Sequence, residues 1–377
     1  MVFFIVYVIC VLPMSVINQR YGIRSVMLIC SSVTTFGLIL KFIALTPSLF
    51  WLSVIGQTLI AVSIIYLNSC PTQIASTWFA KNEANKAMAV LVFANFFALS
   101  VGFLATPLLV ANLTTAVQIA NTLRILILSE AIVSIILLFS ILIFFDSEPK
   151  TPPSMEQQIA SHERESLSFR STIIALFKNP NYILLVISSG CIIGIFNALF
   201  SLLNQMISSK FAHSTSSIGV IGAMYTFSGC ISSSFLGWIA DKFPLKLMYA
   251  LNNFLVFLSM LCFMVLFKFE NLWPFYIVTT LVGFFLSSNF YLALKLAAKV
   301  TYPQSEAICS GILITFNQIT AAIFTAIGSN LISAFSAFAC VVAFCVIVLI
   351  AMVIDCFIKD IRSDENNTLL QQPESIS

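Results

Sequence analysis

Long apolar runs alternate with short polar segments along most of the chain. Eleven runs are long enough, or nearly so, to cross a bilayer as a helix, which needs about 20 apolar residues. The runs lie at 2–17, 26–45, 49–69, 87–110, 123–145, 181–207, 217–240, 247–267, 273–294, 308–330 and 334–357. An open strand in lipid would leave its edge groups without hydrogen bonds, so helices are the expected structure. The pattern predicts an all-α integral membrane protein.

A short polar turn occurs twice, once in each half of the chain. The better-preserved copy is Gly237–Lys246 (GWIADKFPLK), and the weaker copy is Ser15–Arg24 (SVINQRYGIR). Both place a small residue first, a polar residue fifth and cations sixth and tenth. Glycine lets helices approach closely, and a carboxylate at a helix end can pair with a cation or a facing helix N-terminus. We therefore predict close helix packing and charge pairing at these two turns.

The repeat predicts two similar halves. Within the second half, two apolar runs, 181–207 and 217–240, lead up to the turn, whereas within the first half only the run at 2–17 does. We therefore expect twelve helices, of which the first would lie before Met1. The polar segment from Asp146 carries prolines and charges, which end helices. We predict an N-terminal bundle at 1–145 (helices 2–6), a cytoplasmic linker at 146–180, a C-terminal bundle at 181–358 (helices 7–12) and a cytoplasmic tail at 359–377.

Composition and charge agree with this architecture. The chain is 59% hydrophobic and 9% charged, whereas a soluble domain carries about 25% charged residues. Most Lys and Arg fall on one set of alternate loops, which the positive-inside rule makes cytoplasmic. The exceptions are Lys41, Arg124, Lys210 and Lys268. A net charge of +3 does not point to nucleic acid.

The sequence offers little chemistry for an enzyme, a metal or a cofactor. The ten cysteines lie mostly in apolar runs and form no CxxC pair, and both histidines, His162 and His213, lie in loops. A nucleophile–base pair and a phosphate-binding loop are also lacking. We therefore predict no enzymatic activity, no metal site and no cofactor. Haem would find no axial ligand within the helices.

Two cytoplasmic segments carry weaker signals. The 165–178 stretch mixes charge with apolar spacing, and either lies on the membrane surface or packs against the bundle. The tail contains an acidic dileucine pattern built from Glu365, Leu369 and Leu370, which a sorting adaptor would read unless the match is accidental. We expect a monomer in the plasma membrane or an endolysosomal membrane.

Two halves, a central cytoplasmic linker and the repeated turn resemble the major facilitator superfamily, whose signature turn reads G-x-x-x-D-[RK]-x-G-[RK]-[RK]. Further strings resemble the feline leukaemia virus subgroup C receptor-related family, solute carrier family 49. They are LFKN at 176–179, LLNQMI at 202–207, VTYPQSE at 300–306, ASTWF at 75–79 and VGF at 101–103. The resemblance implies a two-bundle fold and transport of choline or ethanolamine, haem, or a pyridoxine-like vitamin. It also implies a conformational latch at the two turns, formed by Gly237, Asp241, Lys242, Lys246, Arg20 and Arg24.

Polar side chains deep in apolar helices are the candidates for solute binding. Such side chains are costly in lipid unless they face a cavity or a partner, and transporters bind solutes near the bilayer midplane. The candidates are Asn95, Asn197, Asn204, Gln205, Tyr225, Asn289, Tyr291, Asn317 and Gln318, with Gln57 as a lesser one. The alternative for each amide is an interhelical hydrogen bond that only supports packing.

The resemblance adds roles at three positions. Asn197 stands where choline-type members have a cage tyrosine, Phe96 stands where they have a glutamine, and Gln318 matches a retained glutamine. Phe96 could supply a replacement ring face. We predict a secondary transporter, uniporter or symporter, of a small organic solute. The alternatives are a transport-deficient accessory protein and an endolysosomal pyridoxine-like vitamin transporter.

Overall fold

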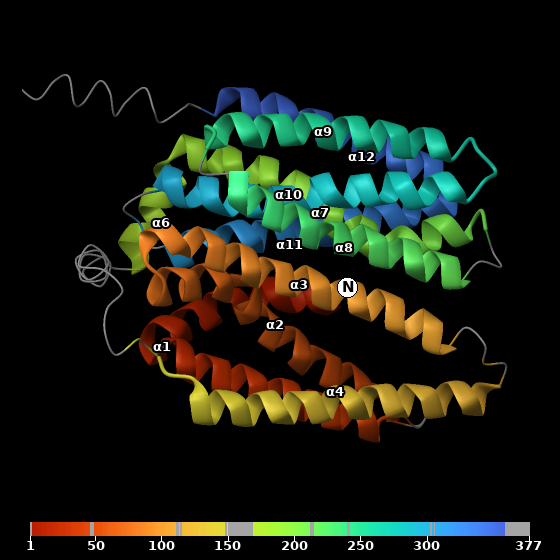
Figure 1. Cartoon of the computed structure of the whole chain (residues 1–377), viewed down its shortest axis with the longest axis horizontal. Coiled ribbons are helices and arrows are strands. Elements are labelled where there is room, and N and C mark those ends of the chain that lie inside the picture. Colours follow the sequence, from red (N-terminus) through yellow and green to blue (C-terminus); the bar gives the residue numbers. More distant parts are fainter. Residues whose placement is uncertain are drawn as a thin grey trace, which may run out of the picture.

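The computed structural model describes residues 2–45, 49–110, 113, 115–147, 149, 169–211, 215–239, 242–301, 304 and 306–358. Long helices run side by side along the long axis (Figure 1). The helices, all long except α6, are α1 (Val2–Ile43), α2 (Phe50–Trp78), α3 (Lys81–Val110), α4 (Ala116–Phe144), α6 (Phe169–Lys178), α7 (Pro180–Ser208), α8 (Thr215–Ile239), α9 (Leu245–Leu266), α10 (Trp273–Thr301), α11 (Glu306–Ala334) and α12 (Ala337–Phe357).

Ten stretches of the described residues are long and apolar enough to cross a membrane, the first being Tyr21–Ile43. The sequence pattern predicts eleven, with a turn after the run at 2–17. The run at 2–17 lies in the first part of α1, which consists of two helices joined at Gly22, a residue with φ 75°. Glycine adopts this left-handed conformation without steric cost, so the chain turns there and a second helix follows. The weaker copy of the turn, Ser15–Arg24, therefore contains the junction between two helices, as predicted.

Local capping explains where α7 begins. Asn179 Oδ1 accepts from the backbone N–H groups of Asn181 and Tyr182 at 3.1 and 3.2 Å, and Pro180 follows as the first residue of α7. A proline is favourable there because its missing N–H would have no partner in the helix. Asn179 Nδ2 also donates to the carbonyl of Val300 at 3.1 Å, which ties the start of α7 to the end of α10.

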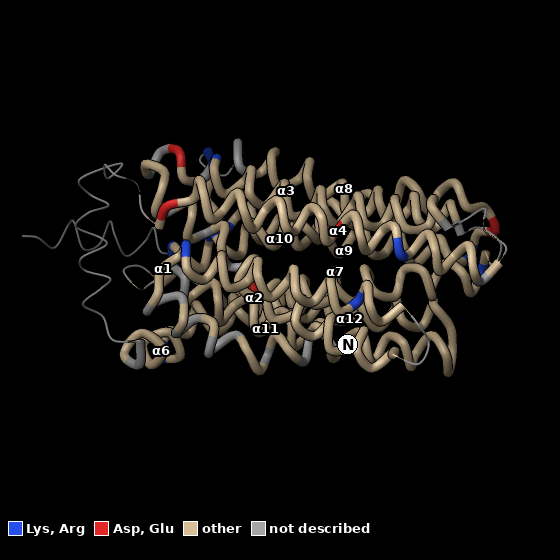
Figure 2. The backbone as a smooth tube through the Cα atoms, turned by 90° about the horizontal axis from the view of Figure 1, so that it is seen from below, with Lys and Arg blue, Asp and Glu red and all other residues tan. Residues whose placement is uncertain are grey.

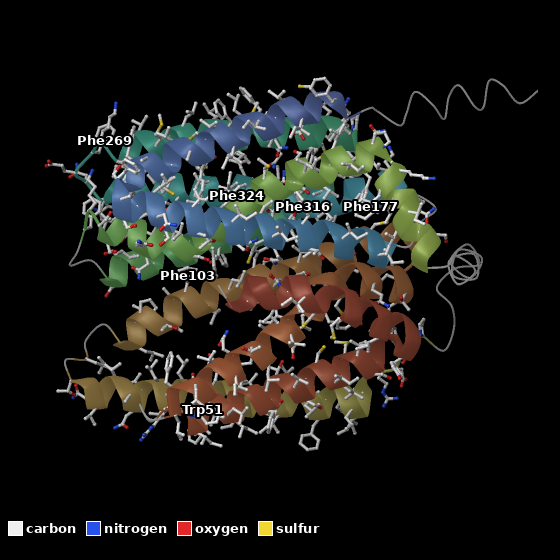
Figure 3. All side chains as sticks on the ribbon, turned by 180° about the vertical axis from the view of Figure 1, so that it is seen from behind. Trp51, Phe103, Phe177, Phe269, Phe316 and Phe324 are labelled. Carbon is white, nitrogen blue, oxygen red and sulfur yellow. The ribbon has the colours of Figure 1, made fainter. Side chains whose placement is uncertain are left out.

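Two groups of helices are visible in Figure 1, α1–α4 and α7–α12. Helix α7 packs against α8, α10, α11 and α12. Two glycines bring α7 close to α11, because a Cβ at Gly190 would lie 2.4 Å from the Phe316 ring and one at Gly194 would lie 2.6 Å from Thr320 Oγ1. Phe316 and Phe324 lie along this contact in Figure 3. Small residues at such positions let transmembrane helices pack backbone to ring.

The two groups meet along α3 and α8, and where α11 contacts α1 and α2. Phenylalanine rings of α3 enter the spaces left by glycines of α8. A Cβ at Gly222 would lie 2.4 Å from the Phe103 ring, and one at Gly229 would lie 2.8 Å from the Phe96 ring. Ser100 of α3 also donates to the carbonyl of Ala223 at 3.0 Å.

Charged residues lie mostly toward the two ends of the helices, with a few along the middle (Figure 2). The short helix α6 packs against α7 and α11, and its Leu176 is buried while Phe177 is exposed. Of the two placements expected for the 165–178 segment, the structure therefore shows packing against the bundle for the described part. The tail from 359, including Glu365, Leu369 and Leu370, lies outside the described residues.

Candidate functional site

A cavity of about 400 Å³ lies between the two groups of helices. Its walls come from α1, α2 and α3 on one side and from α7, α10 and α11 on the other. The lining residues are Phe3, Gln57, Ile64, Asn95, Phe96, Leu99, Ile193, Phe196, Asn197, Phe200, Ser201, Leu286, Ser287, Phe290, Ile314, Asn317 and Gln318. Asn95 and Asn197 lie far from both ends of their helices, as expected for a midplane site.

Aromatic rings form much of the apolar wall. Phe96 of α3 and Phe196 of α7 meet edge to face across the two groups, with ring centroids 5.7 Å apart. The Tyr225 ring stacks on Phe196 at 5.1 Å, and its hydroxyl donates to the Phe196 carbonyl at 3.0 Å. Phe200, one turn further along α7, packs edge to face on Phe103 at 4.7 Å. Packed in this way, the rings are held in place as cavity walls.

Amides form the polar part of the cavity. Gln318 and Asn317 of α11 are buried, yet Gln318 Oε1 and Asn317 Nδ2 have no hydrogen-bond partner among the described residues. Asn197 Nδ2 donates to the Ile193 carbonyl of its own helix at 3.1 Å, which leaves its oxygen for the cavity. A buried polar atom without a partner costs about 1–3 kcal/mol. These amides therefore provide an acceptor and a donor that a solute can satisfy.

Among the described residues that line this cavity, none carries a formal charge, and Ser201 and Ser287 supply the hydroxyls. Rings that present negative π faces attract cations, and amides bind hydroxyl or amino groups. The cavity therefore suits a small solute that is cationic or neutral and carries a polar group.

Of the nine mid-helix candidates, the cavity wall contains four, namely Asn95, Asn197, Asn317 and Gln318, together with Phe96 and the lesser candidate Gln57. Asn289 and Tyr291 are buried but do not line it. It places Tyr225 behind Phe196 rather than in the wall. Asn204 and Gln205 lie further along α7, outside the lining, where Gln205 accepts from Ser329 at 3.5 Å.

Apart from Phe96, sequence reasoning missed the phenylalanine wall. Ile193, Phe196, Asn197, Phe200 and Ser201 follow the i, i+3, i+4 spacing of one helix face. This spacing around Asn197 is the sequence signal that could have predicted which phenylalanines line the cavity. Phenylalanine is so frequent in the chain, at 36 residues, that its presence alone marked no position.

The predicted latch is only partly described. Arg24 pairs with Asp146 at 3.7 Å and donates to the Leu142 carbonyl at 3.0 Å, so it joins α1 to the end of α4. Lys242 and Lys246 lie at the junction of α8 and α9. Asp241, the surroundings of Gly237 and the side chain of Arg20 lie outside what the structure describes.

A second opening of about 770 Å³ lies within the first group of helices, between α1, α2 and α4. Its wall includes Lys41, Gln57 and Glu130, and Lys41 Nζ donates to Gln57 Oε1 at 2.9 Å. Gln57 also lines the cavity between the two groups, so the two spaces share one wall. Among the described residues, no group of His, Cys, Asp or Glu could hold a metal ion.

Comparison with known proteins identifies the family. A profile of the Major Facilitator Superfamily matches residues 1–207 and 185–374. The chain belongs to the major facilitator superfamily. It is 30% identical over 370 residues to the choline/ethanolamine transporter flvcr2a of Danio rerio, covering 97% of this chain and 79% of that protein. The choline/ethanolamine transporter FLVCR2 of Homo sapiens is 30% identical over 373 residues, covering 97% and 70%. The predicted family is confirmed.

Solved structures agree on the fold. A Major Facilitator Superfamily transporter, FucP, in the outward conformation matches with a TM-score of 0.72 at 13% identity, over 95% of this chain and 88% of that one. The human organic anion transporter MFSD10 matches with a TM-score of 0.69 at 15% identity, over 94% and 82%. This major facilitator superfamily protein is a multi-pass membrane protein and a secondary transporter of a small solute, not an enzyme.

Proposed function

We propose that this transporter carries a small organic cation with a hydroxyl or amino group, of the choline or ethanolamine class, by alternating access. The observation that carries the proposal is the cavity, whose described lining combines phenylalanine rings with unpartnered amides and contains no charged residue. Similarity to choline/ethanolamine transporters supports the same solute class.

The rings would hold the cationic end of the solute. A quaternary ammonium donates no hydrogen bonds, so it is attracted mainly by π faces, at about 0.5–2 kcal/mol per ring. Phe96, Phe196, Phe200 and Phe290 line one cavity and can contribute together. Without a carboxylate in the wall, the cation forms no ion pair, and this favours release as well as binding.

The amides would hold the polar end. Gln318 Oε1 can accept from a hydroxyl or amino group, and Asn317 Nδ2 can donate to a hydroxyl oxygen. The same rings and amides also suit a neutral aromatic alcohol of the pyridoxine type, which is the second candidate. Haem is disfavoured because its carboxylates would meet no cation among the lining residues.

Alternating access would involve two bundles, 1–145 and 181–358, moving about the 146–180 linker. In this proposal Gly237, Asp241, Lys242, Lys246, Arg20 and Arg24 act as the latch between states. The transporter would act as a monomer in the plasma membrane or an endolysosomal membrane, and Glu365, Leu369 and Leu370 would bind a sorting adaptor.

Uptake by the purified protein in proteoliposomes tests the solute and the site. We expect uptake of radiolabelled choline and ethanolamine above that of protein-free vesicles. Gln318→Ala and Asn197→Ala should each raise KM about five-fold, because losing one hydrogen bond costs about 1 kcal/mol.

Two matched amides on α7 serve as controls. Asn204→Ala and Gln205→Ala remove the same chemical groups outside the cavity lining and should leave KM unchanged. Equal effects at all four positions would contradict the site. Uptake of pyridoxine in place of choline would select the second candidate, and absence of uptake of every solute would contradict the proposed solute class.

A further inference from the structure

A second polar cluster lies inside the α7–α12 group, built around a carboxyl group. Asp355 of α12 is 4% exposed. Its two oxygens accept from Ser188 Oγ of α7 at 2.5 Å and from Asn253 Nδ2 of α9 at 2.6 Å. Asn289 Nδ2 of α10 donates to Asn253 Oδ1 at 2.6 Å, and Ser188 Oγ lies 3.2 Å from the Tyr249 hydroxyl. The carboxyl group thus joins α12 to α7 and α9, and Asn253 extends the cluster to α10.

Among the described residues, the hydrogen-bond partners of this carboxyl group are neutral. The titratable side chains that interact with Asp355, among the described residues, are Tyr249 of α9 and Cys191 of α7. From α10 the cluster receives Asn289, and α11 adds no titratable group to it within the described part of the chain. An ionised carboxylate buried in a membrane protein without a cation is costly. A bound proton removes that charge.

One hydrogen-bond acceptor of the cluster also has no donor among the described residues. Asn289 is fully buried, yet its Oδ1 has no hydrogen-bond partner among the described residues. The Tyr249 hydroxyl lies 3.2 Å from Ser188 Oγ, and either atom can be the donor. If Asp355 carries a proton, it can donate to Ser188, and Ser188 can then donate to Tyr249. Binding of a proton would therefore reverse the direction of two hydrogen bonds in the cluster.

The cluster lies directly behind the cavity wall. Asn289 precedes Phe290, which lines the cavity, on α10. Ser188 precedes Ser189 on α7, and Ser189 donates to Asn317 Oδ1 of the cavity at 3.5 Å. A change in the hydrogen bonds of the cluster can therefore shift the two helices that carry cavity residues.

We propose that Asp355, with Ser188, Tyr249, Asn253 and Asn289, forms a proton-binding site that makes the packing behind the cavity depend on pH. The proton comes from the aqueous phase, binds to the carboxylate and leaves Asp355 neutral. A metal ion fits this cluster poorly, because it would have to separate atoms that already lie at hydrogen-bond distance. The proposal goes beyond solute transport and holds whatever solute is carried.

Infrared spectroscopy of the purified protein in lipid tests the site directly. A protonated carboxyl group gives a C=O band that an ionised carboxylate lacks. We expect such a band near neutral pH, its loss at alkaline pH, and its absence in Asp355→Asn. The matched control is Asp146→Asn, which removes an exposed carboxylate at the end of α4 and should leave the band in place.

A second variant keeps the test decisive if Asp355→Asn does not fold. Ser188→Ala retains the carboxyl group but removes a donor to its ionised form, so the pH midpoint of the band should move upward. An unchanged midpoint would contradict the cluster. Lack of any band between acid and alkaline pH would overturn the proposal, and so would loss of the band on adding Na⁺ at fixed pH, because the site would then bind a metal ion. These results do not depend on uptake, so they are distinguishable from failure of the proposed solute.

Discussion

The two groups of helices differ in how much of each helix is covered by protein. In the α7–α12 group, 39–67% of the residues in each candidate span are buried, whereas in α1–α4 the share is 11–33%. Helix α7 explains much of the difference, since it lies among α8, α10, α11 and α12 and covers a face of each. In the first group, α1, α2 and α4 instead surround an opening of about 770 Å³.

This contrast shows that apolar sequence alone does not mean a packed core in a membrane protein. Helix α4 is among the most apolar spans and also the least buried. Lipid accepts apolar side chains as readily as protein does, so helices associate through close packing and interhelical hydrogen bonds. The glycines and buried polar groups of α7–α12 supply both, and substitutions in the two groups should therefore have different costs.

The largest difference should come from removing a large aromatic side chain. Phe344 of α12 is fully buried, whereas Phe139 of α4 is 58% exposed. Phe344→Ala leaves a cavity and should lower the free energy of unfolding by about 3–5 kcal/mol. Phe139→Ala should change it by less than about 0.5 kcal/mol. Thermal unfolding in the same lipid or detergent measures both, and equal losses would refute the contrast.

A smaller difference should follow from adding a methyl group at a glycine. A Cβ at Gly283 of α10 would lie 2.1 Å from the Tyr225 carbonyl oxygen, whereas nothing lies within 4 Å of a Cβ at Gly102 of α3. Gly283→Ala should cost about 1–3 kcal/mol through overpacking. Gly102→Ala should be neutral or stabilise by up to about 1 kcal/mol, because alanine favours helix. The same unfolding assay applies, and destabilisation by Gly102→Ala would show that the first group is tighter than the structure indicates.

The smallest effect should come from the ion pair that joins α1 to α4. The Arg24 and Asp146 side chains are 38% and 58% exposed, and exposed pairs contribute at most about 1 kcal/mol. Arg24→Gln should therefore cost up to about 1 kcal/mol, and less at high salt. Arg124→Gln on the exposed surface of α4 is the control. A double-mutant cycle with Asp146→Asn isolates the pair, and a coupling well above 1 kcal/mol would mean that α4 depends on this contact.

The sequence determined the class, the family and most helix positions. Each apolar run must satisfy its backbone internally in lipid, so length and hydropathy were sufficient to predict helices. The mid-helix amides Asn197, Asn317 and Gln318 were also predictable, since a polar group in an apolar run needs a partner or a cavity.

The tertiary structure decided which way the side chains face. Asn204 and Asn197 look alike in sequence, yet only Asn197 lines the cavity. Asp355 stands near the end of the last apolar run, and the structure buries it against α7 and α9. In a soluble helix the polar face marks the surface. A membrane helix is apolar on its lipid face as well, so only its packing against neighbouring helices shows which face is inside.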